Sequence, residues 1–212
     1  MAMRLAIIGS GRMGAALARH VVRVGHEALL ANSRGPAALA PLAARIGARP
    51  LVVHDAVLRG EVVFLAVPYR AIPHVAAEGE PWDGKVVVDL TNYDARRDGP
   101  EHHPRGRSSS TLVGRRLLGA HVVKAFNTIW SERLANPARP PGARGRLALP
   151  VAGDDADAKQ LVMALVHEIG FTPVDGGTLA DGRRQEPGTP VFNQPLDAAG
   201  VREALARAHA GS

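Results

Sequence analysis

Residues 5–14 are Leu5-Ala6-Ile7-Ile8-Gly9-Ser10-Gly11-Arg12-Met13-Gly14. The first four, all apolar, predict a short strand buried on both faces. Beyond the glycines, apolar residues recur at helical spacing (Met13, Leu17, Val21 and Val24), and Gly25 is placed to end that helix. The pattern Gly-x-Gly-x-x-Gly therefore falls where a strand turns into a helix, the context in which it is typical of dinucleotide binding.

Each glycine has a distinct physical role in such a turn. Gly9 permits the tight turn, Gly11 lets a pyrophosphate approach the backbone, and Gly14 lets the helix pack closely on its strand. The free amides and positive dipole at the start of the helix would face the two phosphates. We therefore expect a cofactor site made by Gly9, Ser10, Gly11, Arg12, Met13 and Gly14.

A second predicted strand, 28–31, ends in Asn32-Ser33-Arg34. NAD-specific folds place Asp or Glu here to bind the ribose 2′-hydroxyl. A carboxylate would repel a 2′-phosphate, whereas a hydroxyl and a guanidinium bind it through charge-assisted hydrogen bonds. We therefore predict NADP(H) as the cofactor, with Asn32, Ser33 and Arg34 in its site. The alternative, a glycine turn and a solvated arginine, fits the order and spacing less well.

Composition excludes several classes of function. Of the 212 residues 46% are hydrophobic, and no apolar run has membrane-spanning length. The absence of cysteine rules out disulfides, thiolate nucleophiles and cysteine metal sites. The net charge of +6 suits anionic ligands, but the basic residues are scattered and aromatics make up only 4%, unlike nucleic-acid binders. With no room for a signal peptide before the first strand, we expect a cytoplasmic protein without nucleic-acid or membrane partners.

Strands and helices alternate along the rest of the chain. The expected strands are 51–53, 62–68, 85–90, 121–126, 147–152 and 171–174. The expected helices are 37–46, 55–59, 71–78, one that ends at Leu118, 156–169 and 197–208. Pro41 is expected to disturb the first turn of the first of these helices. The expected N-caps are Asp55 for 55–59, Ser108 to Ser110 for the helix that ends at Leu118, and Asp154 for 156–169. The segments 93–107 and 175–195 are expected to be loops, and 136–146 a linker.

This alternation predicts an α/β fold with a Rossmann-like, doubly wound, mostly parallel sheet covered on both faces. Only about sixty residues follow Arg146, and they repeat a strand-helix-strand pattern, so they extend the same sheet more readily than they form a second core. We expect a single domain over residues 1–212, with a core at 1–135 and a C-terminal sheet extension and tail at 146–212.

Seven segments of the chain together resemble the NADPH-dependent 8-hydroxy-5-deazaflavin reductase family. They are 9–14, Ala31-Asn32-Ser33-Arg34-Gly35, Leu65-Ala66-Val67-Pro68, Val87-Val88-Asp89-Leu90-Thr91-Asn92, Val123-Lys124-Ala125-Phe126-Asn127-Thr128, Ala152-Gly153-Asp154-Asp155 and 170–177. The cytoplasmic domain of membrane ferric reductases is similar to the same family. The resemblance implies hydride transfer between NADP(H) and a deazaflavin.

The resemblance also implies roles for individual residues. Ser10, Ser33 and Arg34 would contact the 2′-phosphate, and Val67 and Pro68, with Ala66 beside them, would border the nicotinamide half. Two departures stand out. Ala37-Ala38 occupies a region where the family has a further basic residue, and Asn127 stands where a histidine lies near the deazaflavin.

Strand ends supply the other candidate site residues. Thr91 and Asn92, and Asn127 and Thr128, fall at carboxyl ends of predicted strands, where open α/β sheets bind ligands. Their amides could hold the nicotinamide carboxamide, with Asn127 and Thr128 nearer the substrate, or could serve only as turn residues. Hydride transfer between stacked rings needs no general base, so no catalytic residue is expected.

Three further groups have an ordinary explanation beside a functional one. Glu101-His102-His103 lies in a predicted loop without a third ligand at fixed spacing, so a solvated tip is favoured and no metal site is expected. Lys124 could anchor an acidic ligand or serve packing. Arg183-Arg184 could bind an acidic substrate tail or be solvated.

The sequence leaves the small-molecule acceptor and the assembly open. The alternatives to a deazaflavin are a flavin, a ferric chelate or a small carbonyl compound, or a non-enzymatic NADP(H) sensor. A homodimer is expected because the tail from Thr178 to Ala208 must bury its apolar residues, and the resemblance suggests the same.

Overall fold

The sheet of this protein runs across the whole molecule in the order β3-β2-β1-β4-β5-β6-β7-β8. The computed structural model describes residues 1–136, 139–140 and 142–210. The strands are β1 (Arg4–Ile8), β2 (Glu27–Ala31), β3 (Arg49–Leu51), β4 (Val62–Leu65), β5 (Val86–Asp89), β6 (His121–Lys124), β7 (Ala148–Gly153) and β8 (Thr172–Asp175). Neighbours from β3 to β6 are parallel, β7 runs antiparallel to β6, and β8 is parallel to β7. The predicted α/β class and mostly parallel, C-terminally extended sheet are confirmed.

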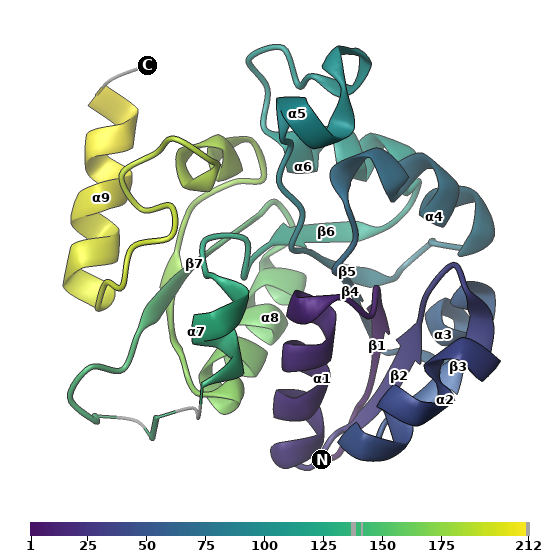
Figure 1. Cartoon of the computed structure of the whole chain (residues 1–212). Helices are drawn as coiled ribbons and strands as arrows, with labels where there is room; N and C mark the ends of the chain where they lie inside the picture. The colour runs from purple at the N-terminus through teal and green to yellow at the C-terminus, as the bar shows by residue number, and fades with distance from the viewer. Residues whose placement is uncertain (137–138, 141, 211–212) are drawn as a thin grey trace.

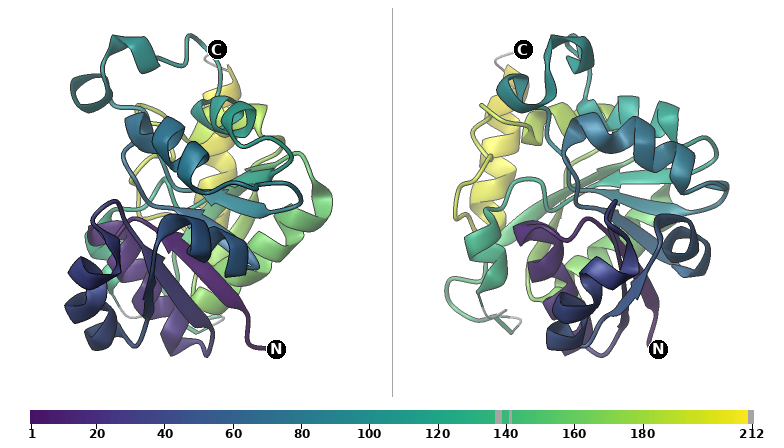
Figure 2. Two further views of the ribbon diagram at one scale, coloured as in Figure 1. Left: turned by 90° about the vertical axis from the view of Figure 1, so that its right-hand side faces the viewer. Right: turned by 45° about the vertical axis from the view of Figure 1, so that its right-hand side comes forward.

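Helices cover both faces of the sheet because its central strands are apolar on both faces. In β1, Leu5 and Ile7 face one core and Ala6 and Ile8 the other. The first core is covered by α1 (Arg12–Arg23), α2 (Gly35–Ile46), α7 (Ser131–Ala135) and α8 (Ala156–Ile169). The second is covered by α3 (Val53–Arg59), α4 (Ile72–Glu78) and α6 (Ser109–Arg116). Figure 2 shows these two layers from further sides.

The C-terminal segment packs on its own chain. Helix α9 (Ala198–Ala210) buries Val201, Ala204 and Leu205 against Ala148 of β7 and Val174 of β8. In Figure 1 this helix lies at the opposite end of the molecule from β3. These three apolar residues of the tail are thus covered by their own chain, and the homodimer stays a prediction. The predicted linker 136–146 lies partly outside the described residues.

Several predicted element boundaries were wrong for local reasons. Helix α2 begins at Gly35, so Pro41 lies inside it and removes one helical hydrogen bond without stopping the helix. The predicted strand 51–53 ends at Leu51, and Val53 instead begins α3. Asp55 therefore lies in the first turn of α3, where its charge favours the helix dipole, rather than at the cap.

Other expected caps make different contacts. Asp155, not Asp154, caps α8 by accepting a hydrogen bond from the amide of Ala158, while Asp154 accepts one from the amide of Leu179. No cap hydrogen bond comes from Ser108, although α6 starts directly after it. The hydroxyls of Ser109 and Ser110 are buried in side-chain contacts described below.

The predicted surface loops contain short helical turns. The first holds α5 (Ala95–Asp98) and the 3-10 turn η2 (Pro100–His102), and the second holds η3 (Ala180–Gln185); a further turn, η1 (Tyr69–Ala71), precedes α4. Asp98 is buried and accepts hydrogen bonds from Arg97 and from the backbone amides of Arg70 and Asp94. Burial alone would raise the pKa of Asp98, but these donors outweigh it and lower the pKa. The first loop is therefore anchored by a buried carboxylate.

His20 joins α1 to α7. Its Nε2 contacts the carbonyl oxygen of Leu134, and its Nδ1 lies 2.7 Å from a guanidinium nitrogen of Arg23. A neutral ring that donates from Nε2 and accepts at Nδ1 satisfies both contacts. Burial, together with the positive charges of Arg23 and Arg19, lowers the pKa of His20.

This lowered pKa predicts a stability loss in acid. Because the unfolded chain takes up the proton first, the free energy of unfolding should fall as the pH drops below about 6.5. His20→Asn should make that fall shallower in urea unfolding between pH 5 and 7. The exposed His54, changed to Asn, serves as the control and should leave the slope unchanged. Equal slopes for His20→Asn and the unaltered protein would contradict the assignment.

Candidate functional site

A cleft of about 410 Å³ opens at the carboxyl ends of β1, β4, β5 and β6. Sheet order reverses direction about β1, with β2 on one side and β4 on the other, and open α/β sheets bind ligands at such a point. The lining residues are Gly11, Arg12, Met13, Ala66, Val67, Pro68, Leu90, Thr91, Asn92, Arg97, Phe126, Asn127, Ile129, Trp130, Ser131, Phe192 and Asn193. The structure thus brings most of the predicted cofactor residues to one cavity.

The three glycines of the loop after β1 are needed for different reasons. Gly9 has φ +114°, and a Cβ there would lie 2.2 Å from the carbonyl oxygen of Ala66. At Gly14 a Cβ would lie 1.9 Å from the carbonyl oxygen of Gly9. A Cβ at Gly11, which is exposed, would meet no atom of the described residues within 4 Å. The fold itself requires Gly9 and Gly14, whereas Gly11 leaves open space beside the first amides of α1.

The end of β2 is tied to this loop by Asn32. Its amide nitrogen donates to the hydroxyl of Ser10 at 2.7 Å, and its amide oxygen accepts from the backbone amide of Arg34 at 2.9 Å. Ser33 and Arg34 are exposed, and within the described part of the chain the Arg34 guanidinium has no ion-pair partner. An exposed hydroxyl and a free guanidinium therefore stand beside the glycine loop.

Both arginines that line the cleft are already paired. The guanidinium of Arg12 forms an ion pair with Glu132 of α7. Arg97 pairs with Asp98 at 2.8 Å and donates to the carbonyl oxygen of Asn92 at 2.6 Å. Among the described lining residues there is no carboxylate, imidazole, amine or phenol. The cleft itself is therefore poor in groups that could transfer a proton.

Asn127 has an amide whose hydrogen bonds are all internal. Its nitrogen donates to Asn92 Oδ1 at 3.0 Å and to the carbonyl oxygen of Gln185 at 2.7 Å, and its oxygen accepts from Gln185 Nε2 at 2.9 Å. Asn127 thus lines the cleft, and its hydrogen bonds join the floor of the cleft to the end of η3. Thr128, also predicted at the substrate, is buried outside the lining, and its carbonyl accepts from the amide of Asn193.

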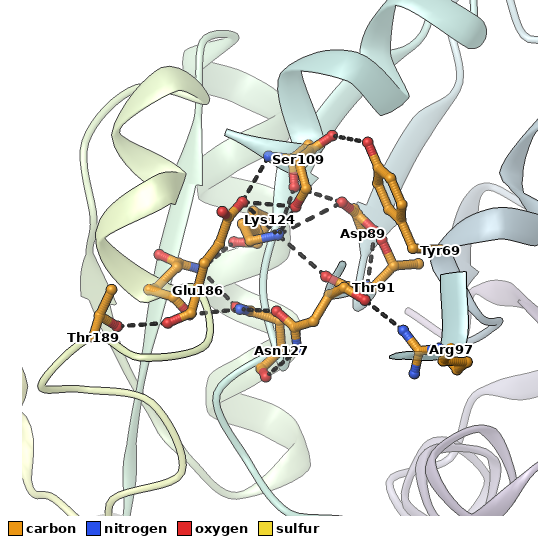
Figure 3. A network of polar contacts seen from close by, with 12 residues as sticks. Tyr69, Asp89, Thr91, Arg97, Ser109, Lys124, Asn127, Glu186 and Thr189 are labelled. Atoms are coloured by element: carbon orange, nitrogen blue, oxygen red, sulfur yellow. Dashed lines mark hydrogen bonds and ion pairs between the residues drawn. The ribbon is translucent and has the colours of Figure 1, made fainter. Parts of the chain in front are cut away.

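Beneath this floor lies a network of charged groups around Lys124, drawn in Figure 3. Lys124 is fully buried, and its ammonium donates to the hydroxyls of Ser109 and Ser110 and to the carbonyl oxygen of Thr91. Two carboxylates lie beside it, Asp89 at 3.8 Å and Glu186 at 3.7 Å. Lys124 is therefore committed to the fold and does not reach a ligand.

The carboxylates extend this network to neighbouring elements. Glu186 accepts from the amide and hydroxyl of Ser109 at 2.6 and 2.7 Å, and Asp89 accepts from the amide of Thr91 at 2.8 Å. Burial and the charges of these two carboxylates raise the pKa of Tyr69 to about 12, so its phenol stays protonated and donates to the carbonyl oxygen of Ser109. Strand ends, α6 and the C-terminal tail are thus joined.

Sequence reasoning did not find Asp89, Gln185 or Glu186. The two strands did carry a signal, because Asp89 and Lys124 each follow an apolar run typical of a buried strand. A charged residue is rarely buried in such a strand unless it is paired. The two residues are register partners on β5 and β6, so each lies beside its counter-charge. Glu186 gave no comparable signal because it lies in a segment without periodicity.

Two aromatic residues and two unusual backbone conformations also mark the cleft. Trp130 is 54% exposed, and Phe192 comes from the tail, so neither was predicted. Phe126 and Asn193 have φ of +61° and +57°, which non-glycine residues rarely adopt. The hydroxyl of buried Thr91 has no hydrogen-bond partner among the described residues. These features concentrate at one cavity.

The Glu101-His102-His103 segment lies away from this cleft. His103 packs its ring against Tyr93 at 5.2 Å, and His102 lies 3.7 Å from Glu101. Within the described ranges no three histidine, aspartate or glutamate side chains gather as metal ligands, and no helix is long and apolar enough to cross a membrane.

Comparison with known proteins identifies the family of the chain. A family model described as NADP oxidoreductase, coenzyme F420-dependent, matches residues 4–93, which hold β1 to β5 and the glycine loop. The hypothetical protein SMa0349 from Sinorhizobium meliloti, whose crystal structure is known, is 38% identical, with 92% of this chain and 95% of that chain covered and a TM-score of 0.82. The chain belongs to this family of NADP oxidoreductases.

Two further relatives differ in how much of their own length this chain matches. An Arthrobacter sp. FB24 protein, provisionally assigned as an F420-dependent NADP-reductase, shares the fold at 24% identity and a TM-score of 0.73, covering 85% of this chain and 87% of that one. The Rattus norvegicus metalloreductase STEAP3 is 29% identical over 185 residues. That match covers 87% of this chain but 36% of STEAP3, so this chain spans about a third of that relative.

The internal hydrogen bonds of Asn127 lead to a stability prediction. Asn127→Ala should lower the free energy of unfolding by about 1–3 kcal/mol, because it removes one of the two acceptors of the buried Gln185 Nε2 and the donor to the Gln185 backbone carbonyl. Exposed Asn136, changed to Ala, should stay within about 0.5 kcal/mol of the unaltered protein. Urea unfolding measures both. A loss at Asn127 no greater than that at Asn136 would mean that the network carries no stability.

Proposed function

We propose that this protein transfers hydride between NADP(H) and a planar two-electron acceptor, of which a deazaflavin of the coenzyme F420 type is our first choice. The observation that carries the proposal is the cleft: its described lining joins the glycine loop to an apolar and aromatic wall without a free acid or base. Its volume of about 410 Å³ is within the range of small-molecule sites.

The phosphates and the nicotinamide half of the cofactor would contact different parts of the site. The pyrophosphate would lie against the amides at the start of α1, where Gly11 leaves room and the helix dipole is positive. The 2′-phosphate would accept hydrogen bonds from Ser33 and the unpaired Arg34. The nicotinamide half would lie along Val67 and Pro68, within reach of the unpartnered hydroxyl of Thr91.

The acceptor would enter from the opposite wall. Phe126, Ile129, Trp130 and Phe192 present apolar and aromatic surface there, suited to a flat ring that excludes water. When bound, NADPH supplies a hydride, and the protein aligns the acceptor to receive it. The further proton that the reduced acceptor takes up comes from water, since both lining arginines are paired.

The composition of the cleft also ranks the other acceptors. A carbonyl compound forms an alkoxide that needs a proton donor, which the described lining lacks. A ferric chelate accepts one electron at a time, whereas hydride carries two. The carbonyl compound and the ferric chelate therefore rank lower, and a flavin is the second choice. STEAP3 is described as a metalloreductase, but this chain matches only about a third of it. A cytoplasmic location and a homodimer stay predictions.

Cofactor choice follows from Arg34. NADPH should bind at least tenfold more tightly than NADH, because charged hydrogen bonds to phosphate contribute about 1.5–3 kcal/mol each. Arg34→Ala should remove most of that difference and leave NADH binding unchanged, while Arg45→Ala, near the far end of α2, should change neither. Isothermal titration measures all three proteins. Equal affinities in the unaltered protein would refute the NADP(H) assignment.

Gly11 separates ligand binding from folding. Gly11→Ala should weaken NADPH binding at least tenfold and shift the melting temperature by less than about 2 °C, since the added methyl meets no atom of the described residues. Gly14→Ala should instead lower the melting temperature, because its methyl collides with the carbonyl of Gly9. Unchanged NADPH affinity in a folded Gly11→Ala protein would place the pyrophosphate elsewhere.

The acceptor is tested by NADPH oxidation with purified deazaflavin, FMN, FAD, ferric chelate and simple aldehydes. We expect fastest turnover with the deazaflavin and a kcat that varies little between about pH 6 and 8, since no free side chain titrates in the described lining. Turnover only with another acceptor would reject the deazaflavin and keep the NADP(H) assignment. NADPH binding without oxidation of any acceptor would favour the sensor.

A further inference from the structure

A second cavity, of about 560 Å³, lies next to the cleft and has a different character. Its walls come from the loop before α6, from η3 and the segment after it, and from helix α9. The charged or titratable side chains on its wall are His103, Arg107, Arg183, Arg184, Glu186 and Arg207, with Tyr93 beside them. Four guanidinium groups thus face one carboxylate.

That carboxylate is shared with buried groups behind the wall of the cavity. Glu186 accepts two hydrogen bonds from Ser109 and lies 3.7 Å from the ammonium of buried Lys124. Its charge is therefore directed inward to the network below the cleft. The cavity keeps a positive excess that the protein does not neutralise through Glu186.

Two of the arginines have no counter-charge. In the part of the chain that the structure describes, Arg107 and Arg183 are exposed and form no ion pair. Arg207 pairs with Glu203 at 3.8 Å on the surface, and Arg184 pairs with Asp181 at 3.1 Å. Two free guanidinium groups on a concave wall suit phosphate or carboxylate, which they bind through paired hydrogen bonds.

Arg184 adds a guanidinium that is fixed in the wall of the cavity. Its side chain is only 19% exposed, and one of its terminal nitrogens donates to the carbonyl oxygen of Gly176. Its Nε is buried and has no partner among the described residues. A buried donor without an acceptor is costly, so the Arg184 guanidinium is held in this wall with one of its possible hydrogen bonds missing.

We propose that this arginine-lined cavity is an anion-binding site for a phosphate or carboxylate group. Its position suggests what carries the anion. Tyr93 lines this cavity and Asn92 the cleft, while Thr189 and Pro190 line this cavity and Phe192 and Asn193 the cleft. The same two chain segments therefore wall both spaces, and an acceptor with its ring in the cleft could place an anionic chain between the arginines.

Direct titration tests the site. Inorganic phosphate and citrate are titrated calorimetrically with NADP⁺ saturating, which fills the phosphate positions of the cofactor site, and again without NADP⁺ in Arg34→Ala, so that the result does not depend on cofactor binding. The double variant Arg107→Ala/Arg183→Ala should weaken binding at least tenfold. Arg45→Ala/Arg59→Ala removes the same charge from α2 and α3 and should leave the affinity unchanged.

The source of the anion is tested with FMN and riboflavin, which share a ring and differ by one phosphate. Tighter FMN binding that is lost in Arg107→Ala/Arg183→Ala assigns the anion to the acceptor. Equal binding of both flavins, with arginine-dependent binding of phosphate or citrate, assigns it to a separate small molecule. No saturable binding of phosphate or citrate up to about 10 mM, or equal affinities in the two double variants, would overturn the proposal.

Discussion

Close backbone packing at the glycine loop is the constraint on which the rest of the structure depends. A Cβ at Gly14 would lie 1.9 Å from the carbonyl oxygen of Gly9, and a Cβ at Gly9 would lie 2.2 Å from that of Ala66. Helix α1 can therefore start directly above β1, and the segment after β4 can lie against the same turn. This contact places the positive end of α1 at the mouth of the cleft and leaves the space beside Gly11 open.

The opposite wall depends on buried charges rather than on close backbone contact. Lys124 lies between Asp89 and Glu186, and the Asn127 amide donates to the backbone carbonyl of Gln185 and accepts from its side-chain nitrogen. Buried ionic groups of this kind are weak sources of net stability but hold a defined geometry, because each loses its partner if the arrangement shifts. Gln185 and Glu186 thus tie the end of η3 to the floor of the cleft. The tail thus completes the cleft of its own chain.

How much of this was predictable depended on whether the signal was local. The glycine loop, β2 with its basic end, and α8 with its Gly170 cap carry periodicity and turn residues within a few positions, and they were predicted. The predicted boundaries and caps of helices were wrong where a residue fits two structural roles. Pro41 remains inside α2, and Ser109 and Ser110 turn inward to charged partners instead of capping α6. The contact of Glu186 with Lys124 joins residues that no local pattern relates, so only the fold reveals it.

We propose that one cleft, between the start of α1 and the floor held by Asn127, takes the dinucleotide with its nicotinamide facing an open apolar wall. The most direct test is a crystal structure with NADP⁺ bound. We predict pyrophosphate against Gly11 and Arg12 amides, the 2′-phosphate on Ser33 and Arg34, and the nicotinamide ring beside Val67 and Thr91 with free space toward Trp130. A nicotinamide ring outside this cleft, or a ring face closed by protein on both sides, would contradict it.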